Sequence, residues 1–247
     1  MKPHFISLSL LAMVHFASIT SGQTTFLIDF GAFDRQTTPA DDPINTWSNF
    51  TTGLTNLNLV DTTGSNSDGY ALELTTTFTS RNLVGPAATT IGDLSISTAT
   101  SDSLYTTGTG QVATLILSGL NSDTLYNFSF FGSRDTTSTR LTTYRVSGST
   151  TESQELQTSG VDLGGSGINM NNSSTSNIGN IAPDGSMNIT IDIFIADSSS
   201  SYGYLNALQI TTSPIPEPTT SGIIMGMSAI LAIFYIKRKT RKQIPMS

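Results

Sequence analysis

The sequence has no cysteine, and its histidines and lysines are confined to the two ends of the chain. The only two histidines among the 247 residues are His4 and His15, and no lysine lies within 23–216. A body that lacks these residues cannot build a Ser-His-Asp triad, a cysteine nucleophile, a lysine Schiff base or a typical zinc site. Carboxylate chemistry and oxygen-ligated calcium are the site chemistries that the composition leaves open.

Positive charge is also scarce in this middle part of the chain. Residues 23–216 contain five Arg against 17 Asp and Glu, which gives them a net charge of −12. A surface this acidic repels phosphate backbones. We therefore expect no nucleic-acid partner.

The N-terminal 22 residues have the pattern of a secretory signal peptide. Lys2 supplies a positive start, the segment 5–16 is mostly apolar, and small residues follow. Thr20 and Gly22 fit the small positions before a cleavage site, which predicts removal of residues 1–22. An uncleaved N-terminal anchor is the alternative, but the apolar run is short for a span of about 20 residues.

The C-terminal end combines an apolar segment with a basic one. Residues 222–236 are uncharged and mostly apolar, and a helix there would extend about 22 Å at roughly 1.5 Å per residue. A bilayer core of about 30 Å accommodates such a transmembrane helix by thinning and with help from flanking residues. The basic cluster at 237–242 favours a cytoplasmic C-terminus, which puts the body on the other side of the membrane.

This tail resembles the PEP-CTERM sorting signal of exported bacterial proteins. The three parts of that signal occur in order: Pro216-Glu217-Pro218, the apolar helix at 222–236 and the basic cluster at 237–242. The resemblance implies a sorting signal over 214–242, an exosortase-type processing enzyme as partner, and association with exopolysaccharide. An ordinary single-span anchor after a proline-rich stalk is the alternative.

Residues 23–213 read as one all-β domain. Their composition is rich in Thr, Ser, Asn and Gly, and apolar residues alternate with polar ones in several short runs between turn signals. About ten such strands in roughly 190 residues favour a β-sandwich of the jelly-roll or galactose-binding-like kind. No amphipathic helix of ten residues or more is expected. The clearest strands are expected at 26–30, 70–74, 112–117, 125–131, 141–146, 189–195 and 204–210.

One ten-residue segment, 117–126, resembles the turn before a core strand in fibronectin type III and similar sandwiches. In that arrangement a Leu fills the core and a Tyr bonds back to the turn backbone. Leu120 and Tyr126 are the residues that match. The resemblance implies a sandwich and says nothing of its function.

Two of the five body arginines are the first candidates for a ligand site. Arg134 falls where one expected strand ends, Arg140 starts the next, and Tyr144 follows on it. Two guanidinium groups can form a forked donor site for sugar hydroxyls or carboxylates. The alternative is that both arginines pair with Asp135 or with other acids.

Aromatic residues supply the other candidate ligand contacts. Tyr202 and Tyr204 lie two positions apart, so on a strand they share a face and can stack on sugar rings, with Asn206 beyond them. Trp47, the one tryptophan, lies in a loop-like stretch. For each of these rings the alternative is a place in the core.

A metal site is suggested only weakly, by the segment from Asp61 to Asp68. With the Gly69 that follows, it places oxygen groups around two glycines, as calcium loops do, but it lacks the EF-hand spacing and the bidentate Glu. A plain turn is the alternative, and no other cofactor is expected.

Together these features predict an exported, non-enzymatic protein of the cell envelope or extracellular matrix. We expect it to bind extracellular polysaccharide and to be anchored in the membrane, at least transiently, by the C-terminal helix. A carboxylate-based glycosidase or lyase is the first alternative, because 17 acids allow many carboxylate pairs. A purely structural surface component is the second.

Overall fold

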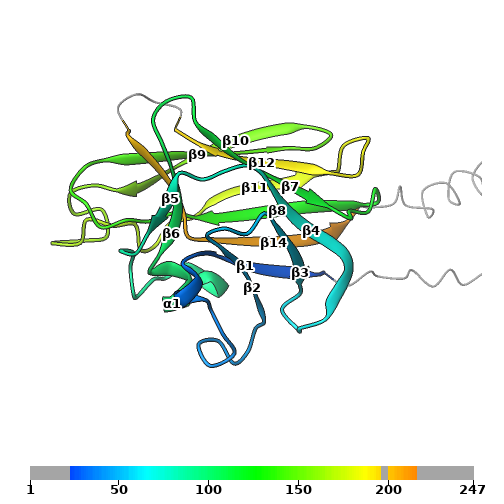
Figure 1. Ribbon diagram of the computed structural model, residues 1–247, viewed down its shortest axis with the longest axis horizontal. Coiled ribbons are helices and arrows are strands. Elements are labelled where there is room, and N and C mark those ends of the chain that lie inside the picture. The colour runs from blue at the N-terminus through cyan, green and yellow to red at the C-terminus, as the bar shows by residue number, and fades with distance from the viewer. Residues whose placement is uncertain (1–22, 196–199, 216–247) are drawn as a thin grey trace, which may run out of the picture.

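The structure of this protein is a computed structural model that describes residues 23–195 and 200–215 (Figure 1). Of residues 66–68 it describes the backbone only. Within the described ranges, no helix is long and apolar enough to cross a membrane.

Both predicted targeting segments lie outside the described residues. This holds for the expected signal peptide at 1–22, for the sorting tripeptide Pro216-Glu217-Pro218, and for the apolar helix at 222–236 with the basic cluster that follows it. These features stay predictions from the sequence.

Two large sheets account for most of the regular structure. Sheet A has the strand order β11-β8-β14-β1-β2, and sheet B has the order β10-β9-β12-β7-β4-β3. Neighbouring strands are antiparallel except β1 and β2, which run parallel. Sheet A consists of β1 (Thr25–Gly31), β2 (Trp47–Thr51), β8 (Thr124–Phe131), β11 (Ser176–Ile181) and β14 (Ala207–Pro214). Sheet B consists of β3 (Asn56–Val60), β4 (Asn66–Thr76), β7 (Val112–Ser118), β9 (Arg140–Ser147), β10 (Thr151–Ser159) and β12 (Ile189–Phe194).

The main core lies between these two sheets, because every second side chain of their strands is apolar. On β12 the side chains of Ile189, Ile191 and Ile193 are fully buried. On β8 the inward side chains are aromatic, and Phe128 and Phe130 join the same core cluster from the opposite sheet. The prediction of an all-β body is confirmed, and its two sheets form a sandwich.

A third, small sheet and three short helices lie beside the sandwich (Figure 1). Part of the connection between β5 and β6 covers one end of the outer face of sheet A, where Leu27, Trp47 and Phe131 pack against Leu94 and Ala99. The small sheet, sheet C, has the order β13-β6-β5, with β13 (Tyr202–Leu205), β6 (Ser103–Thr107) and β5 (Ser80–Asn82). The helices are η1 (Phe33–Arg35), η2 (Gly92–Leu94) and α1 (Ser97–Thr100).

The turn before β8 has the arrangement that the resemblance implied. The backbone N–H of Asn121 donates a 3.0 Å hydrogen bond to Oη of Tyr126, and Leu120 is buried in the core. Gly119 has φ +75°, and a Cβ there would lie 1.9 Å from the carbonyl oxygen of Gly69, so only glycine fits this turn. The tyrosine corner is therefore present.

Two expectations about the strands were wrong. The run at 204–210 is not one strand, because the chain leaves sheet C at Asn206 and enters sheet A at Ala207. Trp47 does not lie in a loop but begins β2. Both errors arise because long-range pairing, which the local sequence does not show, decides where a strand belongs.

Candidate functional site

Four of the predicted ligand residues gather at one end of the molecule, around sheet C. Tyr202 and Tyr204 lie on β13, and Tyr204 pairs with Tyr105 of β6. Arg134 follows the end of β8, and Arg140 is the first residue of β9. We call these five residues the Arg–Tyr cluster. The sequence predicted four of them and missed Tyr105, which joins through strand pairing alone.

The guanidinium groups of this cluster lie over its phenol rings. The Cζ atom of Arg134 is 5.7 Å from the ring centre of Tyr204 and 5.9 Å from that of Tyr202. The Cζ atom of Arg140 is 5.0 Å from the ring centre of Tyr202. These distances are within the range of cation–π attraction. Nη1 of Arg134 also donates a 3.1 Å hydrogen bond to Oη of Tyr204, which fixes the direction of its fork.

The rings of the cluster pack against one another, and the group is buried at one end and open at the other. Tyr202 and Tyr204 are stacked with ring centres 6.2 Å apart, and Tyr105 lies 5.6 Å from Tyr202. Tyr204 is fully buried, whereas Tyr105, Tyr202 and both arginines are half-buried. Burial raises the pKa of Tyr204, and the charge of Arg134 partly offsets that rise. The phenol therefore stays neutral and accepts the hydrogen bond.

The alternative for the two arginines, pairing with an acid, does not occur among the described residues. Asp135 directly follows Arg134 but forms no ion pair with it, and the ion pairs of the described chain involve other arginines. Asp197 lies in segment 196–199, outside the described residues. Two cations thus stand without a described carboxylate in a body that carries many acids.

Two other predicted ligand residues, Tyr144 and Asn206, are interior. Tyr144 is fully buried, stacks on Phe130 with ring centres 4.6 Å apart, and donates its hydroxyl to the carbonyl oxygen of Tyr204. The amide of Asn206 accepts from the backbone N–H of Ser133 at 2.7 Å and donates to the Thr100 carbonyl at 2.9 Å. Tyr144 thus holds β13 and Asn206 holds the segment before Arg134, and neither side chain is free for a ligand.

Trp47 is also interior, as the alternative for it proposed. It is buried in the smaller apolar cluster on the outer face of sheet A. Its Nε1 donates a 2.9 Å hydrogen bond to Oδ2 of Asp42, which also caps the turn at Asn45. The ring therefore packs beneath the segment that covers the outer face of sheet A.

The segment from Asp61, which the sequence suggested as a calcium loop, forms a turn. Oδ1 of Asp61 accepts from the backbone N–H and the hydroxyl of Thr63 and from the backbone N–H of Ser65. These hydrogen bonds lower the pKa of Asp61. The side chain of Asp68 lies outside the description. No group of three or more acids arranged to hold a metal ion occurs in the residues described.

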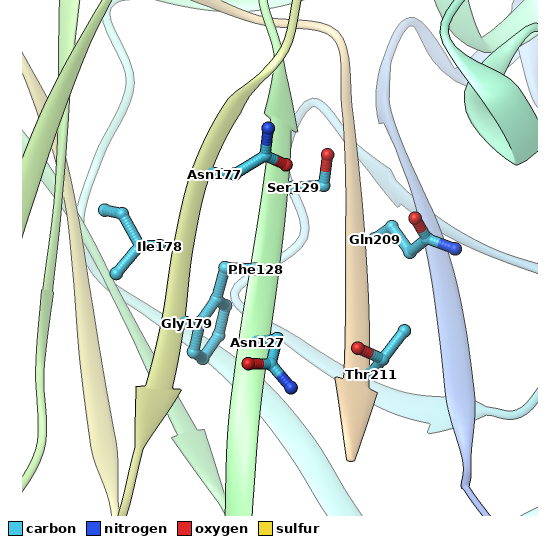
Figure 2. A pocket seen from close by; sticks show the side chains of 8 residues that line it. All are labelled: Asn127, Phe128, Ser129, Asn177, Ile178, Gly179, Gln209 and Thr211. Carbon is cyan, nitrogen blue, oxygen red and sulfur yellow. The ribbon is translucent and has the colours of Figure 1, made fainter. Parts of the chain in front are cut away.

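A second candidate surface, which the sequence did not predict, is a groove on the outer face of sheet A. It is a hollow of about 310 Å³ across the neighbouring strands β11, β8 and β14. Figure 2 shows its side chains on these strands. We call it the sheet groove. Its lining side chains are uncharged, and the polar ones are Asn127 and Ser129 from β8, Asn177 from β11, and Gln209 and Thr211 from β14.

The sheet groove exists because the strands alternate. Asn127 and Ser129 lie between the inward rings of Tyr126, Phe128 and Phe130, so they point to the opposite face. The same alternation on β14 turns Gln209 and Thr211 outward. The covered end of this face stops at η2, where Nε2 of Gln209 donates to Oδ2 of Asp93 at 3.1 Å. The groove lies beyond this covered end.

Strand β11 gives the groove its depth. Its pairing with β8 is irregular between Ile178 and Ile181, and Asn180 has φ +61°. The backbone N–H of Asn180 donates to Oδ1 of Asn127 at 2.9 Å, which orients that amide and leaves its N–H₂ group toward the groove. Gly179 has no side chain, and a Cβ there would lie 2.8 Å from the same Oδ1. A larger residue at 179 would therefore fill the groove.

Two acids are buried beneath the covered end of sheet A. Asp29 lies on β1, and the carboxylate of Asp102 occupies the space that a side chain on Gly31, two residues further on, would take. One oxygen of each carboxylate has no hydrogen-bond partner among the described residues. Burial raises the pKa of Asp29 to about 7, with the charge of Asp102 as a second cause. Burial likewise raises the pKa of Asp102 to about 6.

Comparison with known proteins gives only distant likenesses. No family model and no curated protein matches the sequence. The ANXUR1 extracellular domain from Arabidopsis thaliana is 12% identical over 59% of this chain and 43% of that chain, with a TM-score of 0.41. A structure of the plant peptide RALF23 with FER and LLG2 is 13% identical over 78% of this chain and 52% of that one, with a TM-score of 0.42.

A third solved structure, TmCBM61 with β-1,4-galactotriose, is 14% identical over 60% of this chain and 90% of that chain, with a TM-score of 0.28. This chain spans about half the length of the two plant chains. All three TM-scores are low, so we infer neither fold nor function from these likenesses.

Proposed function

We propose that this protein is an exported, non-enzymatic component of the cell envelope or extracellular matrix whose sandwich binds polysaccharide in the sheet groove. One observation carries the proposal: an open face on three adjacent strands whose polar side chains can all form hydrogen bonds and carry no charge. A neutral sugar chain offers the matching groups, because its hydroxyls both donate and accept.

The chemistry of the lining suits weak, repeated contacts. Amides donate and accept, and the hydroxyls of Ser129 and Thr211 make no hydrogen bond within the described part of the chain. Each new hydrogen bond contributes about 0.5–1.5 kcal/mol net, since it replaces a bond to water. A single groove therefore binds with modest affinity, and tight retention needs many copies on one polymer.

The two ends of the sequence support the proposed location. A signal peptide at 1–22 and a sorting tail at 214–242 together export the sandwich and hold it at the membrane until an exosortase-type enzyme processes the tail. A jelly-roll or galactose-binding-like arrangement of the two sheets belongs to the same proposal. The mass of the protein recovered from cells tests this part, because loss of both ends lowers it by a predictable amount.

The lining also supports a binding role over hydrolysis. Glycoside hydrolysis needs two carboxyl groups about 5–10 Å apart across the sugar. The sheet groove contains no acid among its lining residues, and Asp29 and Asp102, whose pKa values are raised, lie in the interior. A structural surface component, the remaining alternative, predicts self-assembly of the purified protein without ligand.

The direct test is titration of the purified protein with neutral polysaccharides and with the matrix of its own cells. We expect Asn177→Ala and Gln209→Ala each to weaken binding about threefold to tenfold. Gly179→Val should abolish it by filling the groove. Asn58→Ala, at an exposed position of β3 in sheet B, is the matched control and should bind as the wild type does. Unchanged binding by Gly179→Val would exclude the groove.

A further inference from the structure

The five arginines of the body divide into those that the fold supplies with a partner and those that it does not. Arg35 donates to the Leu83 carbonyl oxygen at 3.0 Å, and Nη1 of Arg81 lies 3.8 Å from Oδ1 of Asp34. Arg145 pairs with Asp192. In the described residues, Arg134 and Arg140 form no ion pair, so the only arginines without a described backbone or carboxylate acceptor share one cluster.

Arg145 shows how this fold supplies an arginine with both an aromatic contact and a carboxylate partner. Its Cζ lies 5.1 Å from the ring centre of Phe194, so it has the same aromatic support as the two cluster arginines. Its Nε and Nη2 both donate to Oδ2 of Asp192, at 3.0 and 2.6 Å, and the two residues are directly paired across β9 and β12. The Arg–Tyr cluster has the aromatic half of this arrangement and, within the described residues, lacks the carboxylate.

The cluster presents its unused donors in one place. Among the described residues, only the hydrogen bond from Arg134 to Tyr204 engages its guanidinium groups, although each can donate five. Nε of Arg140 is buried without a hydrogen-bond partner in the described structure. A half-buried cation without a counter-ion carries an uncompensated cost of desolvation. A carboxylate that accepts two hydrogen bonds from it offsets this cost better than water does.

We propose that the Arg–Tyr cluster binds the carboxylate of an acidic sugar unit, with the half-buried faces of Tyr105 and Tyr202 packing against the sugar ring. The proposal rests on the proposed function, because it assigns a substrate class, acidic polysaccharide, to a second surface of the same polysaccharide-binding protein. The acidic surface of the body repels such a polymer at long range, so the cluster acts as a local exception with defined geometry.

The test compares two polymers with the same sugar backbone: polygalacturonate and its methyl-esterified form, in which the ester removes the negative charge. We expect the purified protein to bind the acid form about tenfold more tightly. Arg134→Gln with Arg140→Gln should remove this preference, so that the acid form binds no more tightly than the ester. Arg134→Lys should retain only part of it, since an ammonium cannot form the bidentate pair. Arg81→Gln, in an exposed ion pair, is the control and should keep the full preference.

The outcomes separate this inference from the proposed function. Equal affinity for both polymers, or a preference that survives the double substitution, overturns the inference. If the protein prefers dextran sulfate over dextran as strongly as it prefers polygalacturonate over its ester, the assignment to carboxylate is overturned. If Gly179→Val weakens binding of the ester, but the wild type binds the acid form no more tightly than the ester, only this inference fails. If the protein binds neither these polymers nor its own matrix, the proposed function fails with it.

Discussion

Arg145 and the Arg–Tyr cluster use the same local contact in two different settings. In both, a guanidinium group lies about 5 Å from the centre of an aromatic ring, within the range of cation–π attraction. Arg145 lies inside sheet B, on β9 between β10 and β12, where strand pairing places Asp192 directly opposite. Arg134 and Arg140 stand at a strand end and a strand start, where no such pairing supplies an acid from the described residues.

The contrast shows where polar groups of the described chain remain available to a ligand. Strand pairing satisfies a polar side chain inside a sheet where its cross-strand neighbour carries the complementary group, as Asp192 does for Arg145. Open donors and acceptors therefore collect where pairing ends, as in the Arg–Tyr cluster, or where no described second layer covers a sheet, as in the sheet groove.

The largest difference in stability is expected between substitution of the buried ring and substitution of the open ring of the Arg–Tyr cluster. Tyr204 is fully buried, so Tyr204→Ala leaves a cavity and should lower the free energy of unfolding by about 3–4 kcal/mol. Tyr202 is half-buried, and Tyr202→Ala should lower it by about 1 kcal/mol. Urea denaturation measures both. Equal losses would mean that the cluster is core throughout, with no face for a ligand.

The buried acids extend the contrast, since Asp192 has an arginine partner and Asp29 and Asp102 have none among the described residues. Their pKa values, about 7 and about 6, are above the unfolded value of 3.8, so the folded protein holds more protons between these limits. Stability must then fall as the pH rises from about 4 to about 7, by up to several kcal/mol.

Asp29→Asn should flatten much of this pH dependence, because its side chain no longer loses a proton. Thermal unfolding at a series of pH values across this window measures it. Stability that rises steadily with pH in the wild type would show that these carboxylates are stabilised as anions, which contradicts the account of their burial.

A smaller effect is expected at the satisfied arginine. Asp192→Asn weakens the pair with Arg145 while keeping a partner for the Thr114 hydroxyl, so it should lower the free energy of unfolding by about 1 kcal/mol. Asp135→Asn, beside Arg134, should change it by less than about 0.5 kcal/mol, because Asp135 forms no ion pair with a described residue. Denaturation curves in low salt compare the two. Similar losses would reveal that Asp135 does neutralise the cluster.

A small effect on stability, of the same order as that of Asp192→Asn, is expected for Arg134→Gln. It removes one hydrogen bond and the cation–π contacts of a half-buried side chain, so the change should stay within about 1 kcal/mol. Its effect should instead be seen in binding of acidic polymers. A loss as large as that of Tyr204→Ala would identify Arg134 as a structural residue.

Much of the fold could be predicted from alternation alone. The strands around Phe26–Phe30, Ile189–Ile193 and Tyr126–Phe130 have apolar side chains at every second position, and the structure buries them together. Strands with few apolar residues escaped prediction. Thr151–Ser159 is mostly polar and exposed because it forms an edge of sheet B, and Ser103–Thr107 pairs only with other short strands.

The candidate sites were predictable to different degrees. Tyr202 and Tyr204 share a face because they are two residues apart, which the sequence shows. The approach of Arg134 and Arg140 to those rings depends on how β9 and β13 meet, which it does not show. For the sheet groove, the outward Asn127 and Gln209 were visible as polar residues between apolar ones. Their meeting required the pairing of β8 with β14, two strands that lie far apart along the chain.

The most direct test of the central claim follows the side-chain amide signals of the protein by NMR during titration with a polysaccharide that it binds. If the sheet groove is the binding surface, the N–H₂ signals of Asn127, Asn177 and Gln209 should shift together and saturate, while that of Asn58 on sheet B stays in place. Saturable binding that leaves the three groove signals unmoved would contradict the account.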